Sequence, residues 1–491
     1  MSGNSKASLD LRVPDELWLE IFGTLRPLDV IPLHTVSRKL HRISRSLLFQ
    51  RFHFHLYAVS HNSPPEPRYL LPDEAQVERT TERLRFWASP DIAPLVRQCT
   101  VFPWSSNSDD IEYTHCEEGE RILATFFQLL SQFKNVRSVT FLDVTFCHAW
   151  LSSLAALQSL EQLHVSECSI DPNLDVSSAS IVMKLATFHF YHSAFSSMLN
   201  PTHGANKWLS LLDVETLTHL SLAPERAPSA LIGSAAPLSF PNVHTLHLSV
   251  QEWHEVVQLR RFPSIRSLEI CAGRSAPVTT GIKPVVLSQL ERYTGPAELL
   301  ALLDPKTCPR YIDIRSLSGS SFFDMARNWG PAHRVTVLAL ELEHLEAGIL
   351  PLVLDRWTSL VKLHLKIEHR QWSTPPGVTP YTEQTLLLDL GSASNPVRFP
   401  DSLTSLFITW YYELEESPIP VADVISAART AVPLFVAANP NLKNFRLYMS
   451  QMKYAWGRAD GTDSVVESDS DLQHCVWDHE MWYAMRELHD E

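Results

Sequence analysis

The side chains in this sequence that could bind a metal or carry out catalysis are scattered. The segment His254 to Gln258 begins like a zinc-protease helix, but glutamine stands where the second histidine is needed, so two ligands cannot meet on one face. The pairs His115–Cys116 and Cys147–His148 are isolated, and His53 and His55 alternate along an expected strand. We therefore predict no metal site.

The glycine-rich motifs that bind phosphate or present a nucleophile are also absent. The sequence contains no phosphate loop, no dinucleotide-binding glycine motif and no nucleophile elbow. We expect no catalytic residue and no cofactor, and therefore no enzyme. The formal net charge of −14 disfavours nucleic acid and anionic membranes as partners, because both carry negative charge.

Histidine recurs at one position of a repeated pattern, between two apolar residues. Other copies of the pattern carry Thr140, Ser221, Glu269, Asp313, Phe407 or Arg446 at that position, and four carry histidine: His164, His189, His247 and His364. Neighbouring residues of a strand point to opposite faces, so this position projects away from the apolar side. Histidine is either simply tolerated there, or these residues form a target-binding face whose charge changes near neutral pH.

The pattern that positions these histidines reads apolar-x-x-apolar-x-apolar and returns about every 25 residues. Each copy predicts one short strand with alternate side chains pointing inward. The copies begin at Val96, Val136, Leu160, Leu185, Leu217, Val243, Ile265, Leu290, Pro309, Val335, Leu360, Leu403 and Leu442.

Residues 92–456 with this pattern resemble leucine-rich repeats. The resemblance implies an α/β fold in which strands stack into an irregular solenoid with a curved parallel sheet. The asparagine that usually follows the strand is missing, and only Cys168 occupies its place. A stack of ordinary α/β units with a parallel sheet would share much of the pattern.

The segment 10–50 predicts a module of three short helices. Pro14 suits the first helical turn, Leu17, Ile21 and Leu25 recur at four-residue intervals, and a third helix is expected from about Ser37. Asp29 is expected to cap the short second helix. A module of this size buries too little surface to be stable alone. We therefore expect that it either caps the next domain or docks on a partner.

This segment resembles the F-box signature, with mild departures at Val13, Trp18 and Pro32. The resemblance implies docking on the Skp-type adaptor of Skp–cullin–F-box ubiquitin ligases, and through it on a cullin–RING ligase. The residues that match the signature and are implied to bind the adaptor are Pro14, Leu17, Ile21, Phe22, Leu25, Leu28, Asp29, Leu33 and Val36.

Three further segments complete the predicted organisation. Residues 51–91 are expected to be a linker of strand, loop and helix, and 457–475 an acidic flexible segment. Residues 476–491 predict an amphipathic helix, either a cap on the repeats or a partner motif. The stretch from Ser89 to Val101, after an F-box, resembles fungal F-box proteins.

The compartment is expected to be the cytoplasm, the nucleus or both, and not the secretory pathway. The seven cysteines form no Cys-x-x-Cys pair, and the N-terminus lacks the apolar core of a signal peptide.

The predicted function is that of a substrate receptor of a ubiquitin ligase, which binds an unknown protein target. The alternative is a non-enzymatic repeat scaffold whose F-box-like helices only cap the solenoid.

Overall fold

A computed structural model shows how the chain is arranged in two compact units, residues 1–251 and 252–491. The structure describes residues 14–25, 27–55, 58–60, 68–70, 73–102, 117–176, 181–192, 205–224, 239–250, 259–272, 285–300, 303–304, 307, 309–317, 322–323, 326, 332–346, 348–369, 383–392, 397–412, 421–449, 452–459 and 462–468.

The first unit begins with three helices: α1 (Asp15–Gly23), α2 (Pro27–Leu33) and α3 (Arg38–Leu48). The Ser37 hydroxyl accepts a hydrogen bond from the Leu40 amide and so caps α3, which begins close to the position that the sequence predicts. Asp29 lies inside the first turn of α2 and does not cap it, because the helix already begins at Pro27. Proline is favoured at that first position, where its missing N–H is not needed.

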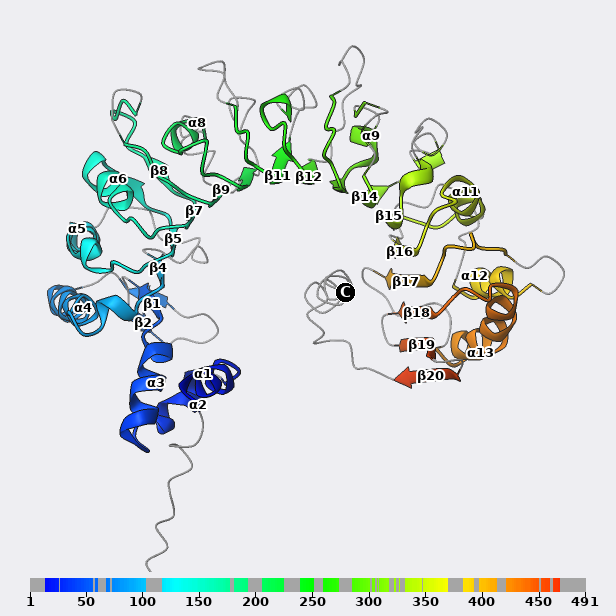
Figure 1. The fold of residues 1–491 in the computed structure, drawn as a ribbon, viewed down its shortest axis with the longest axis horizontal. Helices are drawn as coiled ribbons and strands as arrows, with labels where there is room; N and C mark the ends of the chain where they lie inside the picture. The colour runs from blue at the N-terminus through cyan, green and yellow to red at the C-terminus, as the bar shows by residue number, and fades with distance from the viewer. Residues whose placement is uncertain are drawn as a thin grey trace, which may run out of the picture. The chain divides into compact units, whose positions relative to one another are not determined.

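A parallel sheet follows the helices in the first unit (Figure 1). Its strand order is β1-β4-β5-β7-β9-β10-β11, and each described pairing is parallel. The strands are β1 (Arg51–His55), β4 (Gln98–Phe102), β5 (Ser138–Leu142), β7 (Gln162–Ser166), β9 (Thr187–His192), β10 (His219–Pro224) and β11 (Thr245–Val250). Two further pairs are β2 (Ala58–Ser60) with β3 (Arg68–Leu70), and β6 (Thr145–Phe146) with β8 (Ser169–Ile170).

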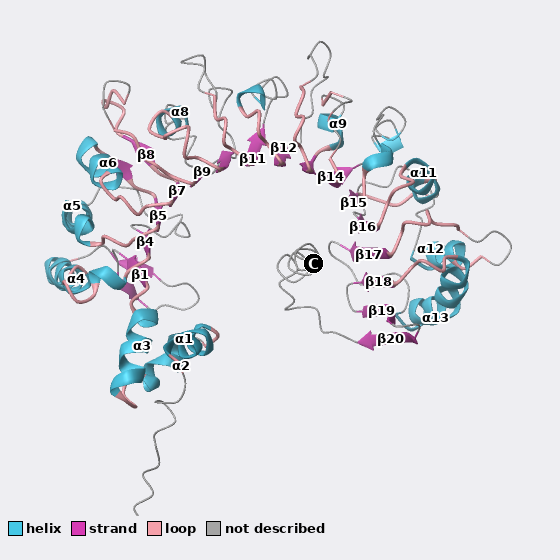
Figure 2. Cartoon of the chain, viewed as in Figure 1, coloured by secondary structure: helices cyan, strands magenta, loops and turns pink. Residues whose placement is uncertain are grey.

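Helices cover one face of this sheet (Figure 2). They are α4 (Glu74–Trp87), α5 (Glu117–Leu129), α6 (His148–Ala155) and α8 (Ala205–Leu209), with short 3-10 turns at Ala93–Leu95 and Leu130–Gln132. The aromatic rings of α5 pack on the strands: Phe126 lies 5.9 Å from Phe54, and Phe127 lies 5.6 Å from Phe141, between ring centroids. The apolar members of the repeated pattern therefore face the helices, and the histidine position faces away from them.

The second unit repeats this plan with the strand order β12-β13-β14-β15-β16-β17-β18-β19-β20. The pairings from β12 to β18 are parallel, and those of β18 with β19 and of β19 with β20 are antiparallel. The strands are β12 (Ser267–Ala272), β13 (Arg292–Gly295), β14 (Tyr311–Leu317), β15 (Val337–Leu342), β16 (Lys362–His369), β17 (Ser405–Tyr412), β18 (Asn444–Met449), β19 (Met452–Ala459) and β20 (Thr462–Ser468).

Helices also lie along one side of the strands in the second unit (Figure 1). They are α9 (Ala297–Leu300), α11 (Ile349–Arg356), α12 (Glu383–Leu390) and α13 (Val421–Ala438), with a 3-10 turn at Ala332–Arg334. Phe435 of α13 lies 5.0 Å from Phe445 of β18. The mixed helix and strand composition and the mostly parallel sheet that the sequence predicts are thus confirmed, because every copy of the apolar pattern falls on a parallel strand.

Two predicted segments differ in part from the structure. Residues 51–91 contain the predicted strand and helix, as β1 and α4, but β1 pairs with β4 and so belongs to the sheet. The acidic segment 457–475 is not a loop throughout, because residues 462–468 pair with β19 in register from Thr462 opposite Ala459 to Ser468 opposite Lys453. A charged strand at a sheet edge resists further pairing. The predicted C-terminal helix at 476–491 lies outside the described residues.

Candidate docking surfaces

The three N-terminal helices enclose a small core of their own. Phe22, Leu40 and Ile43 are buried in it, and Trp18, Leu33 and Leu47 pack against them. Two residues that match the F-box signature, Phe22 and Leu33, therefore point into the module. Phe22 is only 3% exposed, so it stabilises the module and offers no surface to a partner.

Other signature residues lie on the surface of the module. Leu17 and Ile21 are one turn apart on α1 and are each 49% exposed. Leu25 follows α1 and Val36 follows α2, and both side chains are exposed. Pro14 and Asp29 are also exposed, and the side chain of Leu28 lies outside the described residues. Exposed apolar side chains gathered in a short segment are typical of an interaction surface.

Two exposed residues of the module escaped the sequence prediction. Leu19 and Ile31 are both large, apolar and exposed, although neither belongs to the signature stripe. The signal available in the sequence was their position on short helices, which cannot bury apolar side chains on every side.

Ion pairs and a polar cluster fix the helices relative to each other. Asp15 at the start of α1 pairs with Lys39 at 3.2 Å and with Arg42, both on α3. The hydrogen bond from Lys39 lowers the pKa of Asp15. Within the core, the buried Ser44 hydroxyl lies 3.0 Å from His34 Nδ1, so this polar group is not left without a partner.

Three of the four predicted histidines lie on one face of the first sheet. His164 pairs in register with His189, and Ser221 lies in register with both His189 and His247. The rings of His164 and His189 are stacked 4.1 Å apart at 12°. The three side chains are half-buried, and they make a row of hydrogen-bonding groups across the strands.

Two histidines of the row, His164 and His189, have pKa values below the ordinary value, which opposes a change of charge near neutral pH. Burial lowers the pKa of His164, and burial together with the neighbouring histidines lowers the pKa of His189 to about 4. Partial removal from water disfavours the charged imidazolium. Neutral imidazoles still donate and accept hydrogen bonds, so His164 and His189 can recognise polar groups in their uncharged form.

His364 does not lie on an accessible surface, which corrects the prediction. It is 8% exposed, and its Nε2 lies 3.0 Å from the Thr409 hydroxyl on the next strand. Burial lowers the pKa of His364 to about 4. His364 is therefore a satisfied core residue, and a target cannot reach it without rearrangement.

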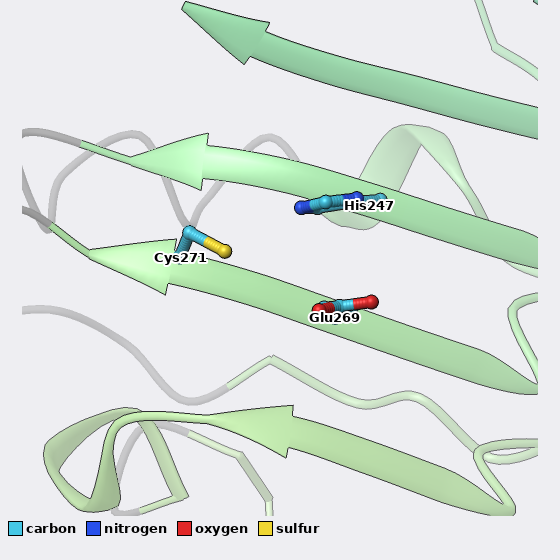
Figure 3. Close-up of side chains that lie close together, drawn as sticks. All are labelled: His247, Glu269 and Cys271. Atoms are coloured by element: carbon cyan, nitrogen blue, oxygen red, sulfur yellow. The ribbon is translucent and has the colours of Figure 1, made fainter. Parts of the chain in front are cut away.

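In the second unit, the face of the sheet that lacks helices carries charged side chains. Glu269 and Asp313 occupy the histidine position on β12 and β14, and Figure 3 shows Glu269 and Cys271 projecting from β12 and His247 from β11. Arg315, Glu341 and Lys366 follow two residues after the histidine position of their strands and so share that face. Alternation was the signal that could have identified them from sequence.

The remaining predicted site residues are scattered or undescribed. His148 begins α6 and Cys147 precedes it, while His53 is exposed on β1. His115, Cys116, His254 and Glu255 lie outside the described residues. Burial raises the pKa of the Cys99 and Cys168 thiols, which keeps both in the unreactive thiol form.

Comparison with known families identifies the N-terminal module. Residues 11–52 match the F-box domain, which confirms the resemblance drawn from the signature. Comparison with curated proteins gave no match. Among the helices in the described part of the chain, none is long and apolar enough to span a membrane.

Proposed function

From the F-box domain at residues 11–52, we propose that the protein is the substrate-recognition subunit of a Skp–cullin–F-box ubiquitin ligase. The observation that carries the proposal is the exposed apolar surface of α1 within the matched segment, with Leu17 and Ile21 half-exposed. Burial of this surface in an apolar groove of the Skp-type adaptor would supply the affinity. The adaptor would join the chain to a cullin–RING ligase.

In this proposal the protein contributes no catalytic side chain. It raises the rate of ubiquitin transfer by holding a target near the other subunits. The transfer then takes place between groups of one complex and does not need a chance encounter of two molecules in solution. A protein target is the partner, and neither nucleic acid, membrane nor cofactor takes part.

We further propose that the strands and helices form an irregular leucine-rich-repeat-like solenoid. Support comes from the thiol of Cys168, which takes the place of the usual asparagine. Its sulfur accepts a hydrogen bond from the Val144 amide at 3.4 Å and donates one to the Ser166 carbonyl at 3.2 Å. A side chain that ties consecutive turns together in this way is what stacked units need.

The target-binding role is assigned to the face of the sheets that lacks helices. In the first unit His164, His189 and His247 offer hydrogen-bonding groups on that face. His364 is left out of this assignment because it is buried.

Adaptor binding is the test of the proposal. The full-length chain and the variant Leu17→Asp/Ile21→Asp are each mixed with purified adaptor, and binding is measured by calorimetry. We expect binding by the wild type and a loss of at least about 100-fold in the variant, because two charges would be buried in an apolar interface.

A matched control is Leu388→Asp/Leu434→Asp, which places the same two charges on exposed leucines of α12 and α13 in the second unit. It should bind the adaptor like the wild type. Failure of the wild-type chain to bind would refute the receptor proposal.

One observation favours the alternative, in which the helices only cap the sheet. The module contacts the rest of its unit: Phe49, after α3, lies 5.3 Å from Trp87 of α4, and Arg45 donates to the Asp91 carbonyl at 3.0 Å. A cap needs such contacts, but it does not need Leu17 and Ile21 to be exposed. The adaptor measurement therefore separates the two proposals.

A further inference from the structure

Two neighbouring histidines of the first unit have ring nitrogens that no protein group uses. His164 on β7 and His189 on β9 are half-buried, and their rings stack with 4.1 Å between the centroids and 12° between the planes. Within the part of the chain that the structure describes, no hydrogen bond or ion pair joins either ring to another group. Polar groups that are withdrawn from water normally have a hydrogen-bonding partner. These nitrogens are therefore open to a ligand.

Several other described histidines do use a ring nitrogen within the protein. The Nδ1 atom of His34 lies 3.0 Å from the Ser44 hydroxyl, and the Nε2 atom of His364 lies 3.0 Å from the Thr409 hydroxyl. On β10, the Nδ1 atom of His219 lies 2.8 Å from the hydroxyl of Thr218. The unused nitrogens are therefore a property of the place that His164 and His189 occupy in the sheet.

The register of the sheet places the two imidazoles side by side. His164 pairs in register with His189, and Thr140 and Ser221 take the same position on the strands to either side. Neighbouring strands lie about 5 Å apart, a spacing from which two imidazoles can bind one ion. Because the strands hold both residues in place before any ligand arrives, little freedom is lost when an ion binds.

The surroundings of the pair suit a metal ion. Burial lowers the pKa of His164, and burial together with other histidines lowers the pKa of His189 to about 4, so a metal need not displace a proton at neutral pH. On the same face, the described positions of strands β4, β5, β7, β9, β10 and β11 hold no lysine or arginine that would repel a cation. They hold no aspartate or glutamate either, so the ligands on offer are nitrogen atoms.

We propose that His164 and His189 bind a transition-metal ion of the class of Zn²⁺, Ni²⁺ or Cu²⁺ on the helix-free face of the first sheet. Imidazole suits these ions, whereas Mg²⁺ and Ca²⁺ prefer oxygen ligands. His219, exposed at the start of β10, interacts electrostatically with His189 and can supply a third imidazole.

This site goes beyond the proposed receptor function, which requires no metal. It also departs from the expectation of no metal site. That expectation compares ligands close together in the chain, whereas the two histidines come from different strands and meet only in the folded sheet.

The test is a calorimetric titration with Zn²⁺ of the full-length chain, prepared without an affinity tag and dialysed against a chelator. The variant His164→Gln/His189→Gln keeps two neutral hydrogen-bonding side chains but removes both imidazoles. We expect it to bind one ion fewer per chain than the wild type, because zinc sites in proteins use imidazole, thiolate or carboxylate and not an amide.

The matched control is His53→Gln/His333→Gln, which removes two exposed histidines, one from each unit. It should bind as many ions as the wild type. A second variant, His164→Cys, should keep the ion, because thiolate and imidazole bind Zn²⁺ together. A fold damaged by substitution at this position would lose the ion in this variant as well.

Three outcomes would overturn the inference. An equal loss in the control would show that Zn²⁺ binds to exposed histidines in general. Loss of the ion in His164→Cys would show that the fold, and not the ligand, is responsible. An unchanged number of ions in His164→Gln/His189→Gln would show that the pair binds no metal, and would leave its imidazoles to form hydrogen bonds with a protein target.

Discussion

The pKa of Asp313 differs from that of an ordinary aspartate. An aspartate normally loses its proton near pH 4, but burial and the neighbouring Glu341 and Glu269 raise its pKa to about 6. The groups that face it also include Arg315 on its own strand and Lys366 on β16, and β13 contributes Thr294, in register with Asp313, and Arg292 on the same face. The ionised form is therefore less stable in the folded chain than in water.

This shift predicts that Asp313→Asn stabilises the protein at pH 7, by about 2 kcal/mol. A carboxyl with a raised pKa is protonated in the folded state first, so its destabilising effect is absent below about pH 4 and grows as the pH rises toward 6. Urea unfolding followed by circular dichroism at pH 4 and pH 7 would check this. A gain of the same size at both pH values would show that ionisation is not the cause.

The proposed docking depends on the helical module, in which one side of α1 is buried and the other is exposed. Phe22 is buried with Leu40 and Ile43, whereas Leu17 and Ile21 are exposed one turn away. The spacing in the sequence places Phe22, Leu17 and Ile21 together in one group of signature residues. The packing of α1 on α3 divides them.

At this scale we expect Phe22→Ala to loosen the module and leave the sheet intact. Loss of a buried phenylalanine costs about 3 kcal/mol, because a cavity remains, and so the amides of α1 and α3 should exchange hydrogen faster while those of β5 and β7 do not change. Leu19→Ala is the control, since Leu19 is exposed. Equal acceleration in the sheet would indicate that the module and the sheet unfold together.

Across the whole molecule, the surfaces proposed for adaptor docking and for target binding are different. The F-box module and the histidine row both lie in the first unit, but the row lies on strands β7 to β11 and the docking surface on α1. The two activities should therefore respond to different substitutions.

We expect His189→Ala/His247→Ala to weaken target capture and to leave adaptor binding unchanged. The reason is the loss of two hydrogen-bonding side chains from the sheet face, far along the chain from the module. Affinity capture from cells and adaptor calorimetry, performed on the same variant, would measure both. Loss of both activities would point to a folding defect instead.

The local pattern in the sequence determined the elements of this protein. The spacing of Leu17, Ile21 and Leu25 and the F-box signature gave the docking module, and the period-two alternation gave the parallel strands, because both depend on residues close together in the chain. Composition and missing motifs could only support the expectation of a binding protein, and that expectation remains a proposal.

Tertiary structure alone decided which of these residues can be reached and which are charged. It buried Phe22 and His364 and joined the expected strand β1 to the sheet. It also made part of the acidic segment into strand β20 and brought Arg315 to Glu269 across β13. Burial and ion pairing depend on residues that are distant in sequence, and pairing across strands is set by register. The F-box could therefore be identified from the sequence, whereas the ion pair of Arg315 with Glu269 became visible only in the folded sheet.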